Sequence, residues 1–446
     1  MEFTERTMFV DQDAGVEKSM QIINSNWEGK IIIDNKLLEK KVCDNGYYIV
    51  SYNKNELKNI DPEYSSSIYS KLRSVVFNKN NTCLSFSPMK SITLNSFETL
   101  YPYGDSDVVI EQFVEGTMIN LFYDENSNEE TKWQISTKTK VGGYNSFYNY
   151  GTPVNKNFKE MFLETLKDVN LELDTLDKNL SYSFVMQHID NRVVSKYVFN
   201  DLILVEAYKV NNEDSSLNEE NKHTIYVEYV DVYSLSEMFK DTKVRLPERF
   251  HLSNYDSYSN ILRHFNSAFD VSDKSIFYKS QIDCVIKGII IKNIKTGVRV
   301  KSRNETYEFL AKLRGNQSKL EYHYLTLRKE KNIDLFLHIY PEFEKEFLNF
   351  RDKVHTFTQA LHYNYYRCFK QHALKLSEIQ YELRSHLFEI HKNYLNSLRG
   401  TGKTIQFDDI KDYVNNLPEA RLMYSINFNM RKNNNKLVRQ YASGAM

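Results

Sequence analysis

The sequence has few cysteines and no long apolar run. Its four cysteines, Cys43, Cys83, Cys284 and Cys368, lie far apart and show no paired spacing. Closely spaced cysteines are typical of zinc clusters and disulfide frameworks, so we expect free thiols in a reducing compartment and no structural metal. No apolar run approaches the length of a membrane-spanning helix, and no charged start followed by an apolar stretch opens the chain. We therefore expect a cytoplasmic protein without a membrane partner.

An excess of charge of either sign is also missing. Lys and Arg number 58 against 59 Asp and Glu, so the field of the whole protein gives no general attraction to nucleic acid. Any site for a polyanion must therefore be local. The apolar content of 41% and the charged content of 26% are those of a folded protein, and 446 residues are too many for one ordinary core.

Short apolar or alternating runs, broken by Asn, Asp, Gly and Ser, dominate the chain up to about residue 310. Such runs are typical of strands. We expect strands at 47–52, 74–77, 107–124, 133–137, 181–188, 201–210, 223–233 and 284–293, and helices at 156–168 and 254–269. Because strands and helices do not alternate regularly, the pattern favours an α+β fold with mainly antiparallel sheets.

After residue 315 the apolar period changes to between three and four. Six apolar side chains from Phe343 to Leu361 would lie on one face of a long helix that begins near Pro341, and residues 368–398 continue in the same register. A coiled-coil dimer is one explanation, but so aromatic a stripe favours packing inside a helical bundle. We therefore expect two domains, 1–312 and an all-helical 313–446.

Several segments of the first domain carry side chains suited to a nucleotide pocket. A lysine or arginine at a strand end can bind phosphate, and residues at i and i+2 of a strand face the same side. In chain order, the segments are "KLRSVVF" with Arg73, "FSPMKS" with Lys90, "EQFVEGT" with Phe113, Glu115 and Gly116, "STKTKVGG" with Lys138 and Lys140, "YSFVMQHIDNRVV" with Asn191 and Arg192 opening a strand, "IKGIIIKN", and "VRVKSRNETY" with Arg299 and Lys301.

The order of these segments resembles that of the phage-type RNA ligases, which belong to the covalent nucleotidyltransferase superfamily. The chain is most similar to the divergent ligase-like proteins of large DNA viruses. The resemblance covers roughly residues 47 to 310, and a helical domain after the last motif also fits. It implies the RNA/DNA ligase fold with ATP-grasp-like antiparallel sheets. For a viral protein it also implies a place in the host cytoplasm or the virion.

The departures from the family pattern bear on activity. The family's nucleophile motif is Lys-x-Asp/Glu-Gly-Ser/Thr, and "FVEGT" has Phe113 in place of the lysine. Val185 and Lys287 stand where two later motifs have Glu, and Arg299 replaces a lysine. In the family the lysine attacks ATP with the help of a divalent metal, and a phenyl ring has no nucleophilic atom. We expect Phe113, Val185 and Lys287 to converge on one cleft.

Three functions remain open at this stage. The first is a degenerate ligase-like protein that binds a nucleotide, an RNA end or a partner from a viral replication, transcription or virion complex, with no cofactor. The second is an active RNA ligase, with ATP and magnesium, whose nucleophile has moved, for example to Lys90 or Lys138. The third is a structural viral protein. The expected binding residues are Arg73, Lys90, Glu115, Gly116, Lys138, Lys140, Asn191, Arg192, Arg299 and Lys301, with no metal ligands.

Overall fold

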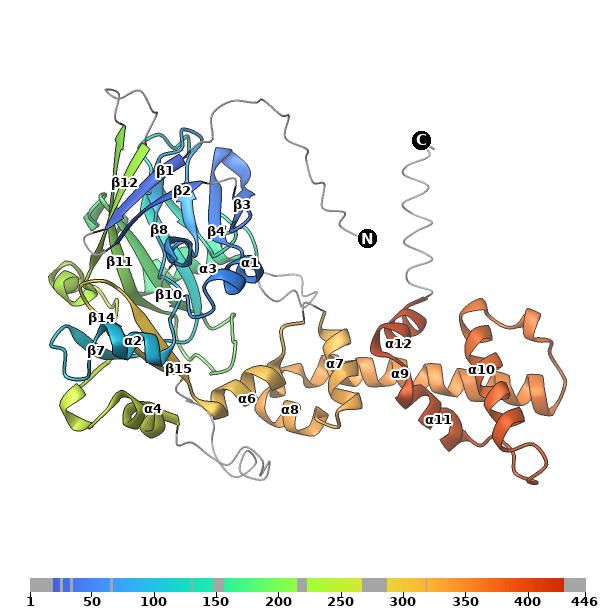
Figure 1. The fold of residues 1–446 in the computed structure, drawn as a ribbon. Coiled ribbons are helices and arrows are strands. Elements are labelled where there is room, and N and C mark those ends of the chain that lie inside the picture. The colour runs from blue at the N-terminus through green and yellow to red at the C-terminus, as the bar shows by residue number, and fades with distance from the viewer. Residues whose placement is uncertain are drawn as a thin grey trace, which may run out of the picture. The chain divides into compact units, whose positions relative to one another are not determined.

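The computed structural model describes most of the chain, in two compact units. The described residues are 19–24, 27–32, 35–64, 67–129, 131–146, 156–214, 223–266, 287–317 and 319–428. Within them, the first unit extends to Phe309 and the second begins at Leu310 (Figure 1). The sequence-based boundary at 312 lies three residues from this division. Among these residues, no helix is both long enough and apolar enough to span a bilayer.

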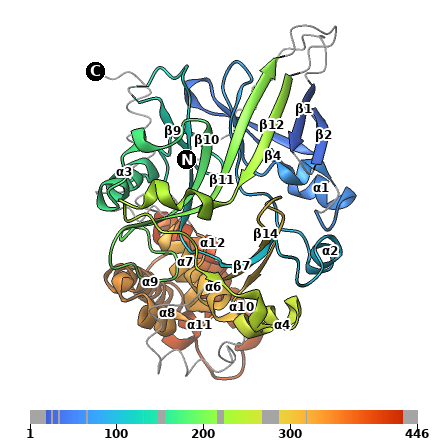
Figure 2. The ribbon, with the colours of Figure 1, turned by 90° about the vertical axis from the view of Figure 1, so that its left-hand side faces the viewer.

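The first unit contains a seven-stranded sheet in the order β2-β1-β12-β11-β10-β8-β9. Its strands are β1 (Ser19–Asn24), β2 (Trp27–Ile32), β8 (Thr117–Tyr123), β9 (Trp133–Ser136), β10 (Leu180–Gln187), β11 (Asp201–Asp214) and β12 (His223–Val230). Neighbouring strands are antiparallel except β1 and β12, which are parallel and lie side by side in Figure 2.

Two four-stranded antiparallel sheets complete the β-structure of this unit. One has the order β13-β7-β14-β15 and the other β3-β4-β5-β6. Their strands are β13 (Arg249–Phe250), β7 (Val108–Gln112), β14 (Gly288–Asn293), β15 (Arg299–Arg303), β3 (Leu38–Val42), β4 (Tyr48–Tyr52), β5 (Val75–Phe77) and β6 (Cys83–Ser85). The helices are α1 (Lys54–Ile60), α2 (Leu94–Leu100), α3 (Phe158–Asp168) and α4 (Tyr258–Asn266), while α6 (Glu305–Arg314) crosses the boundary between the units.

Two large apolar cores form on opposite faces of the seven-stranded sheet. On one face, Phe162 of α3 packs with Phe184 and Leu204. Helix α3 begins with a capping box between Asn157 and Glu160, which satisfies free backbone donors of its first turn. The second core joins the other face to the two smaller sheets. The predicted α+β arrangement with mainly antiparallel sheets is thus confirmed, and the smaller sheets supply one wall of the candidate site.

The stretch 107–124 was expected to be one strand, and this prediction was wrong. It forms two strands in different sheets, because β7 pairs with β13 and β14 whereas β8 pairs with β9 and β10. Residues 113–116, between the two strands, cross from one sheet to the other. Strands β1, β2 and β3 were not expected. The side chains of β3 are mostly exposed, so its sequence lacks the alternation that indicates a strand.

The second unit is helical. It comprises α7 (Leu320–Lys329), α8 (Ile333–Ile339), α9 (Glu344–Tyr365), α10 (Tyr381–Ser397), α11 (Phe407–Asn416) and α12 (Glu419–Ile426). Phe347 of α9 stacks on Phe336 of α8 and contacts Tyr324 of α7, so the aromatic stripe packs inside a bundle. The predicted continuation of one register through 368–398 was wrong. A π-helical turn, Tyr366–Lys370, ends α9, and a segment with one 3-10 turn, Leu376–Glu378, precedes α10.

The cysteines of the described residues carry free thiols. Cys83 and Cys368 are buried and Cys43 is half-buried, and burial raises the pKa of the Cys368 thiol. Cys284 and the start of the strand expected at 284–293 lie outside the described residues, and β14 begins at Gly288.

Candidate anion-binding site

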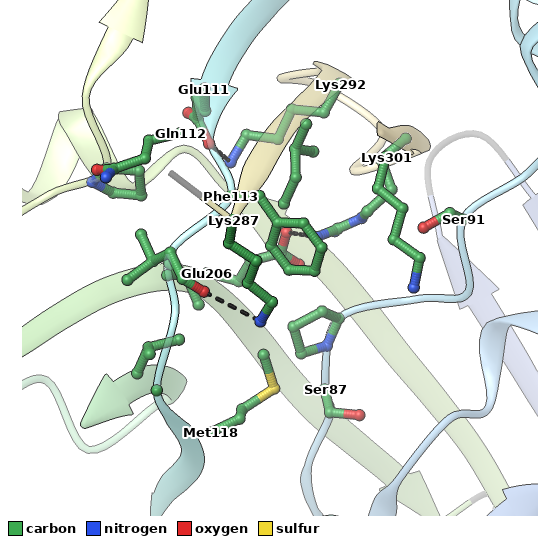
Figure 3. A pocket seen from close by; sticks show the side chains of 18 of the residues that line it. Ser87, Ser91, Glu111, Gln112, Phe113, Met118, Glu206, Lys287, Lys292 and Lys301 are labelled. Atoms are coloured by element: carbon green, nitrogen blue, oxygen red, sulfur yellow. Dashed lines mark hydrogen bonds and ion pairs between the residues drawn. The ribbon is translucent and has the colours of Figure 1, made fainter. Parts of the chain in front are cut away.

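A cavity of about 250 Å³ lies along the crossover between β7 and β8. This volume is slightly below the usual range for ligand pockets, which begins at about 300 Å³. Phe113, Val185 and Lys287 all line the cavity, so the three residues that depart from the family motifs do converge on one cleft (Figure 3). The further lining residues that matter below are Arg73, Ser87, Glu111, Gly116, Met118, Lys138, Glu206, Lys292, Arg299, Lys301 and Arg303.

Two glycines allow backbones to pass close together beside the cavity. Gly116 has a φ of +140°, and a Cβ atom there would lie 2.5 Å from the carbonyl oxygen of Met186 on β10. Gly288, with a φ of +145°, would place a Cβ atom 2.0 Å from the carbonyl oxygen of Ser302. The amide of Phe113 donates to the carbonyl of Gly288 at 2.9 Å. Without side chains at these positions, the crossover can lie between β10 and β14.

Glu115 has an internal structural role. Its carboxylate accepts hydrogen bonds from the amides of Val194 (2.7 Å) and Ser195 (3.1 Å) and from the Ser195 hydroxyl (2.6 Å). A strand was expected to open at Asn191 and Arg192, and this prediction was wrong, because residues 188–200 form a loop whose amides bond partly to Glu115. Glu115 itself does not line the cavity.

The Asn-Arg step also lies outside the cavity lining. The side-chain amide of Asn191 donates to the Thr117 hydroxyl at 2.8 Å, and the guanidinium of Arg192 donates to the carbonyl of Val194 at 3.1 Å. Both contacts fasten the loop after β10 to its neighbours. Ligand binding by Glu115, Asn191 and Arg192 stays a prediction.

The acidic groups of the cavity are paired with cations. Glu206 of β11 is 1% exposed and forms an ion pair with Arg299, whose guanidinium also donates to the carbonyl of Gly297. Glu111 is 2% exposed and contacts Lys292 at 2.6 Å and Arg249 at 3.0 Å.

These two pairs were missed in the sequence. Glu206 and Arg299 are 93 positions apart in the sequence, and Glu111 and Lys292 are 181 positions apart. Only the folded sheets bring such residues together. A glutamate inside each apolar strand was the available signal. The pairing also changes the expected role of Arg299, because this cation lines the cavity but is already neutralised.

Besides the exposed Lys138, three half-buried cations of the cavity have no salt-bridge partner within the described part of the chain. They are Arg73, two residues before β5, Lys287, just before β14, and Lys301 on β15. Lys287 and Lys301 lie on the ring of Phe113, with ammonium nitrogens 4.1 and 5.9 Å from its centroid. Figure 3 shows this ring between the two lysines. A cation over an aromatic ring is stabilised but remains available to an anion.

The remaining predicted lysines differ in position. Lys138 lines the cavity from the turn after β9, and its side chain is exposed. Lys90 lies outside the lining, with its ammonium 4.4 Å from the centroid of the Tyr64 ring. Lys140 also lies outside, and its carbonyl accepts a bond from the Thr137 amide. Of the ten predicted binding residues, five line the cavity, namely Arg73, Gly116, Lys138, Arg299 and Lys301.

The unpaired cations lower the pKa values of one another. Burial, together with the charges of Arg73, Arg303, Lys90 and Lys287, lowers the pKa of Lys301 to about 7. Burial also lowers the pKa of Lys287 to about 8, with Glu115 acting in the opposite direction. Desolvation lowers the pKa of Arg73, and nearby Arg299 has the same effect. The cavity therefore holds a surplus of positive charge that a bound anion would relieve.

A divalent metal does not fit this cavity. Magnesium prefers free carboxylate oxygens, whereas Glu111 and Glu206 are engaged by cations and positions 185 and 287 carry Val and Lys. A different acidic group is formed by Glu164, His188 and Asp190, whose ligand atoms lie within 4.8 Å of one another. The ammonium of Lys156 already bridges its two carboxylates at 2.8 and 2.9 Å. The His188 ring lies 3.0 Å from the Glu164 carboxylate, and its Nδ1 accepts from the Asp190 amide at 3.1 Å.

No family model matches the sequence, and no curated protein matches it. Solved structures give distant matches. A mutant RNA ligase of Naegleria gruberi with ATP and Mn is 11% identical, with a TM-score of 0.29, over 46% of this chain and 51% of that chain. The chain thus spans about half the length of that ligase. An archaeal ATP-dependent RNA ligase is 8% identical, with a TM-score of 0.32, over 89% of this chain and 75% of that one. Its second form is 9% identical, with a TM-score of 0.31, over 91% and 76%.

The matching structures include both RNA ligases and a putative ATP-dependent DNA ligase. All the TM-scores lie below 0.5, so the proposals below rest on the geometry of this chain and not on these likenesses. The viral origin expected from the sequence stays a prediction.

Proposed function

We propose that the cavity binds a phosphate-bearing anion, either a nucleotide or an RNA end, without forming a covalent lysyl-nucleotide. The observation that carries this proposal is the trio of Arg73, Lys287 and Lys301, three cations without salt bridges in a cavity whose carboxylates are already paired. Charge-assisted bonds to phosphate are among the stronger interactions of a binding site. The apolar wall of Val114, Val185 and Met118 offers contact area beside these cations.

Binding without transfer follows from the same residues. A nucleotidyl transfer needs a nucleophile held in line with the phosphorus and a counter-charge for the departing pyrophosphate. Phe113 provides no nucleophile, and the paired Glu111 and Glu206 are not free to hold a metal. The cavity can therefore bind a ligand although it lacks the groups that nucleotidyl transfer needs.

Isothermal titration calorimetry with ATP, and with oligoribonucleotides that do or do not carry a 5′-phosphate, tests the proposal. We expect Arg73→Ala and Lys301→Ala each to weaken binding of the phosphorylated ligand by about tenfold or more, because a hydrogen bond to a charged group contributes about 1.5–3 kcal/mol. Lys240→Ala is the matched control, since Lys240 is exposed and pairs with Glu237 away from the cavity. Equal affinities for all four proteins would contradict an anion site here.

A second candidate is an active ligase with a displaced nucleophile. The observation in its favour is the position of Lys287, whose amine lies 4.1 Å from the centroid of the ring that replaces the motif lysine. Incubation with α-labelled ATP and magnesium separates the two functions. We expect no covalently labelled protein. A labelled band that disappears in Lys287→Ala, Lys301→Ala, Lys90→Ala or Lys138→Ala would establish transfer and overturn binding alone.

A further inference from the structure

Lys301 has an amine without a partner in a site that is otherwise well paired. The residue lies on β15 opposite Ile290 of β14, and its side chain is half-buried. Within the described part of the chain its ammonium makes no hydrogen bond or salt bridge, and it lies 5.9 Å from the centroid of the Phe113 ring. Lys287 differs, because its ammonium donates to the carbonyl of Val114 at 3.3 Å. Of the two lysines on the ring, Lys301 is therefore the freer to react.

The surroundings of Lys301 favour the neutral amine. Burial, followed by the charges of Arg73, Arg303, Lys90 and Lys287, lowers its pKa to about 7. An ordinary lysine has a pKa of about 10.4 and carries about one neutral amine per thousand at pH 7.4. A desolvated lysine beside other cations is the usual setting of an amine that attacks carbonyl groups.

Because the acids of the cavity are already paired, they limit the reactions that such an amine can perform. Attack on a phosphate needs a stabilised leaving group, and Glu111 and Glu206 are not free to hold a metal for that purpose. Attack on an aldehyde needs no leaving group beyond water. Arg73 lines the same cavity without a salt bridge and can hold the phosphate of a ligand that carries both groups.

We propose that Lys301 forms a reversible imine with an aldehyde-bearing phosphate ester whose phosphate is bound by Arg73. The amine nitrogen adds to the carbonyl carbon, and a proton passes from nitrogen to oxygen to give a carbinolamine. Loss of water then leaves the carbon–nitrogen double bond, so no oxidant or reductant takes part. This inference rests on the proposed anion-binding function and adds a substrate class to it.

Pyridoxal 5′-phosphate is a suitable probe. The full chain is incubated with it at pH 7.5, the imine is reduced with borohydride, and peptides are mapped by mass spectrometry. We expect one adduct per chain, on Lys301, and at least tenfold slower labelling by pyridoxal, which lacks the phosphate. Lys301→Arg should abolish the adduct while keeping the charge, and Arg73→Ala should slow labelling about tenfold. Exposed Lys240 is the internal control.

Labelling of Lys240 as fast as Lys301, or equal rates for pyridoxal and its phosphate, would overturn the proposal. If Lys301→Arg fails to fold, protection of the natural chain by inorganic pyrophosphate remains decisive: Lys301 must be protected. Calorimetry with ATP on the same preparation tests the anion site independently of the imine. ATP binding without an adduct contradicts only the imine, whereas absence of both contradicts the anion site itself.

Discussion

At the scale of single residues, the backbone at Gly116 sets how closely β8 and β10 approach beside the cavity. We expect Gly116→Ala to lower the free energy of unfolding by about 2 kcal/mol or more, because a positive φ and a contact of 2.5 Å with the Met186 carbonyl are both unfavourable. Gly104→Ala is the matched control, with a φ of +94° and nothing within 4 Å. Urea unfolding measures both, and equal losses would show that the close approach has no cost.

The identity of residue 113 permits a direct test of lost transfer. We expect Phe113→Lys to restore the sequence of the nucleophile motif but not self-labelling with ATP, because Glu111 and Glu206 remain paired and Val185 supplies no carboxylate. The variant should also be less stable than Phe113→Met, since it adds a third amine beside Lys287 and Lys301. Labelling and thermal melting are the measurements. A labelled lysine at 113 would mean that the nucleophile alone had been lost.

The two lysines on the Phe113 ring give anion binding a defined pH dependence. Their pKa values are about 7 and about 8, so both lose charge as the pH rises through this window. We expect the affinity for ATP to fall from pH 6.5 to pH 9, by at most about tenfold per pH unit for each lysine. Lys301→Arg should flatten the profile, because an arginine stays charged. A profile that rises with pH would contradict cationic lysines as the ligand contacts.

Stability has the opposite pH dependence at Lys301. Its folded pKa lies below its ordinary value of 10.5, so the unfolded chain binds the additional proton between these values. The lysine therefore destabilises the fold fully below about pH 7, and this penalty disappears as the pH rises toward 10.5. Stabilisation by Lys301→Met at pH 7 that vanishes near pH 10.5 would be the expected signature in urea unfolding.

At the scale of elements, a buried histidine connects α10 to α11 and α12. His386 is 2% exposed and contacts the Tyr413 hydroxyl of α11 at 2.8 Å and the Ser425 hydroxyl of α12 at 2.9 Å. Burial and, to a lesser extent, nearby Arg421 lower its pKa to about 4, with Glu389 acting in the opposite direction. A histidine held neutral contributes stability that is present above its unfolded pKa of about 6.5 and is lost as the pH falls toward 4.

We therefore expect acid to destabilise the chain between pH 6.5 and pH 4, and His386→Gln to remove part of this dependence. Urea unfolding of the full chain at several pH values measures it. His355→Gln is the control, because His355 is exposed on α9 and should leave the pH dependence unchanged. The same slope in all three proteins would contradict a role for His386.

The elements also show which parts of the fold sequence reasoning can reach. The short apolar runs of β10 and β11 and the aromatic stripe of α9 were sufficient. A strand buried on both faces gives a short apolar run, and a helix buried on one face repeats its apolar residues every three to four positions. The split between β7 and β8 was not visible, since it depends on a glycine conformation and on distant partners. The end of α9 was missed because residues 368–398 keep apolar spacing through a break. At the site, convergence of Phe113, Val185 and Lys287 could be predicted from motif order, but the Glu206–Arg299 pair could not.

At the scale of the whole molecule, the formal net charge is −1, so the overall charge does not attract an anion. The cavity is therefore the proposed source of attraction. We expect the salt dependence of oligoribonucleotide binding to be shallow. If phosphates are contacted by four cations, Arg73, Lys138, Lys287 and Lys301, a plot of log K against the logarithm of the salt concentration should have a slope of about −3. Each contact on a single strand contributes about −0.7 to this slope. Fluorescence anisotropy from 50 to 400 mM salt measures the slope. A slope near −10 would indicate an extended RNA surface elsewhere.

The cavity wall has a mechanical consequence. Arg73 precedes a strand of one small sheet, Lys301 lies on a strand of the other, and Val185 belongs to the seven-stranded sheet. An anion held by Arg73 and Lys301 would act as a reversible crosslink between these layers, in addition to the apolar core and the Glu206–Arg299 ion pair. At a concentration of 100 times Kd such a ligand stabilises the fold by about 2.7 kcal/mol. Hydrogen exchange of β5 and β15 should then slow together when the ligand binds, so that three sheets open as one cooperative body.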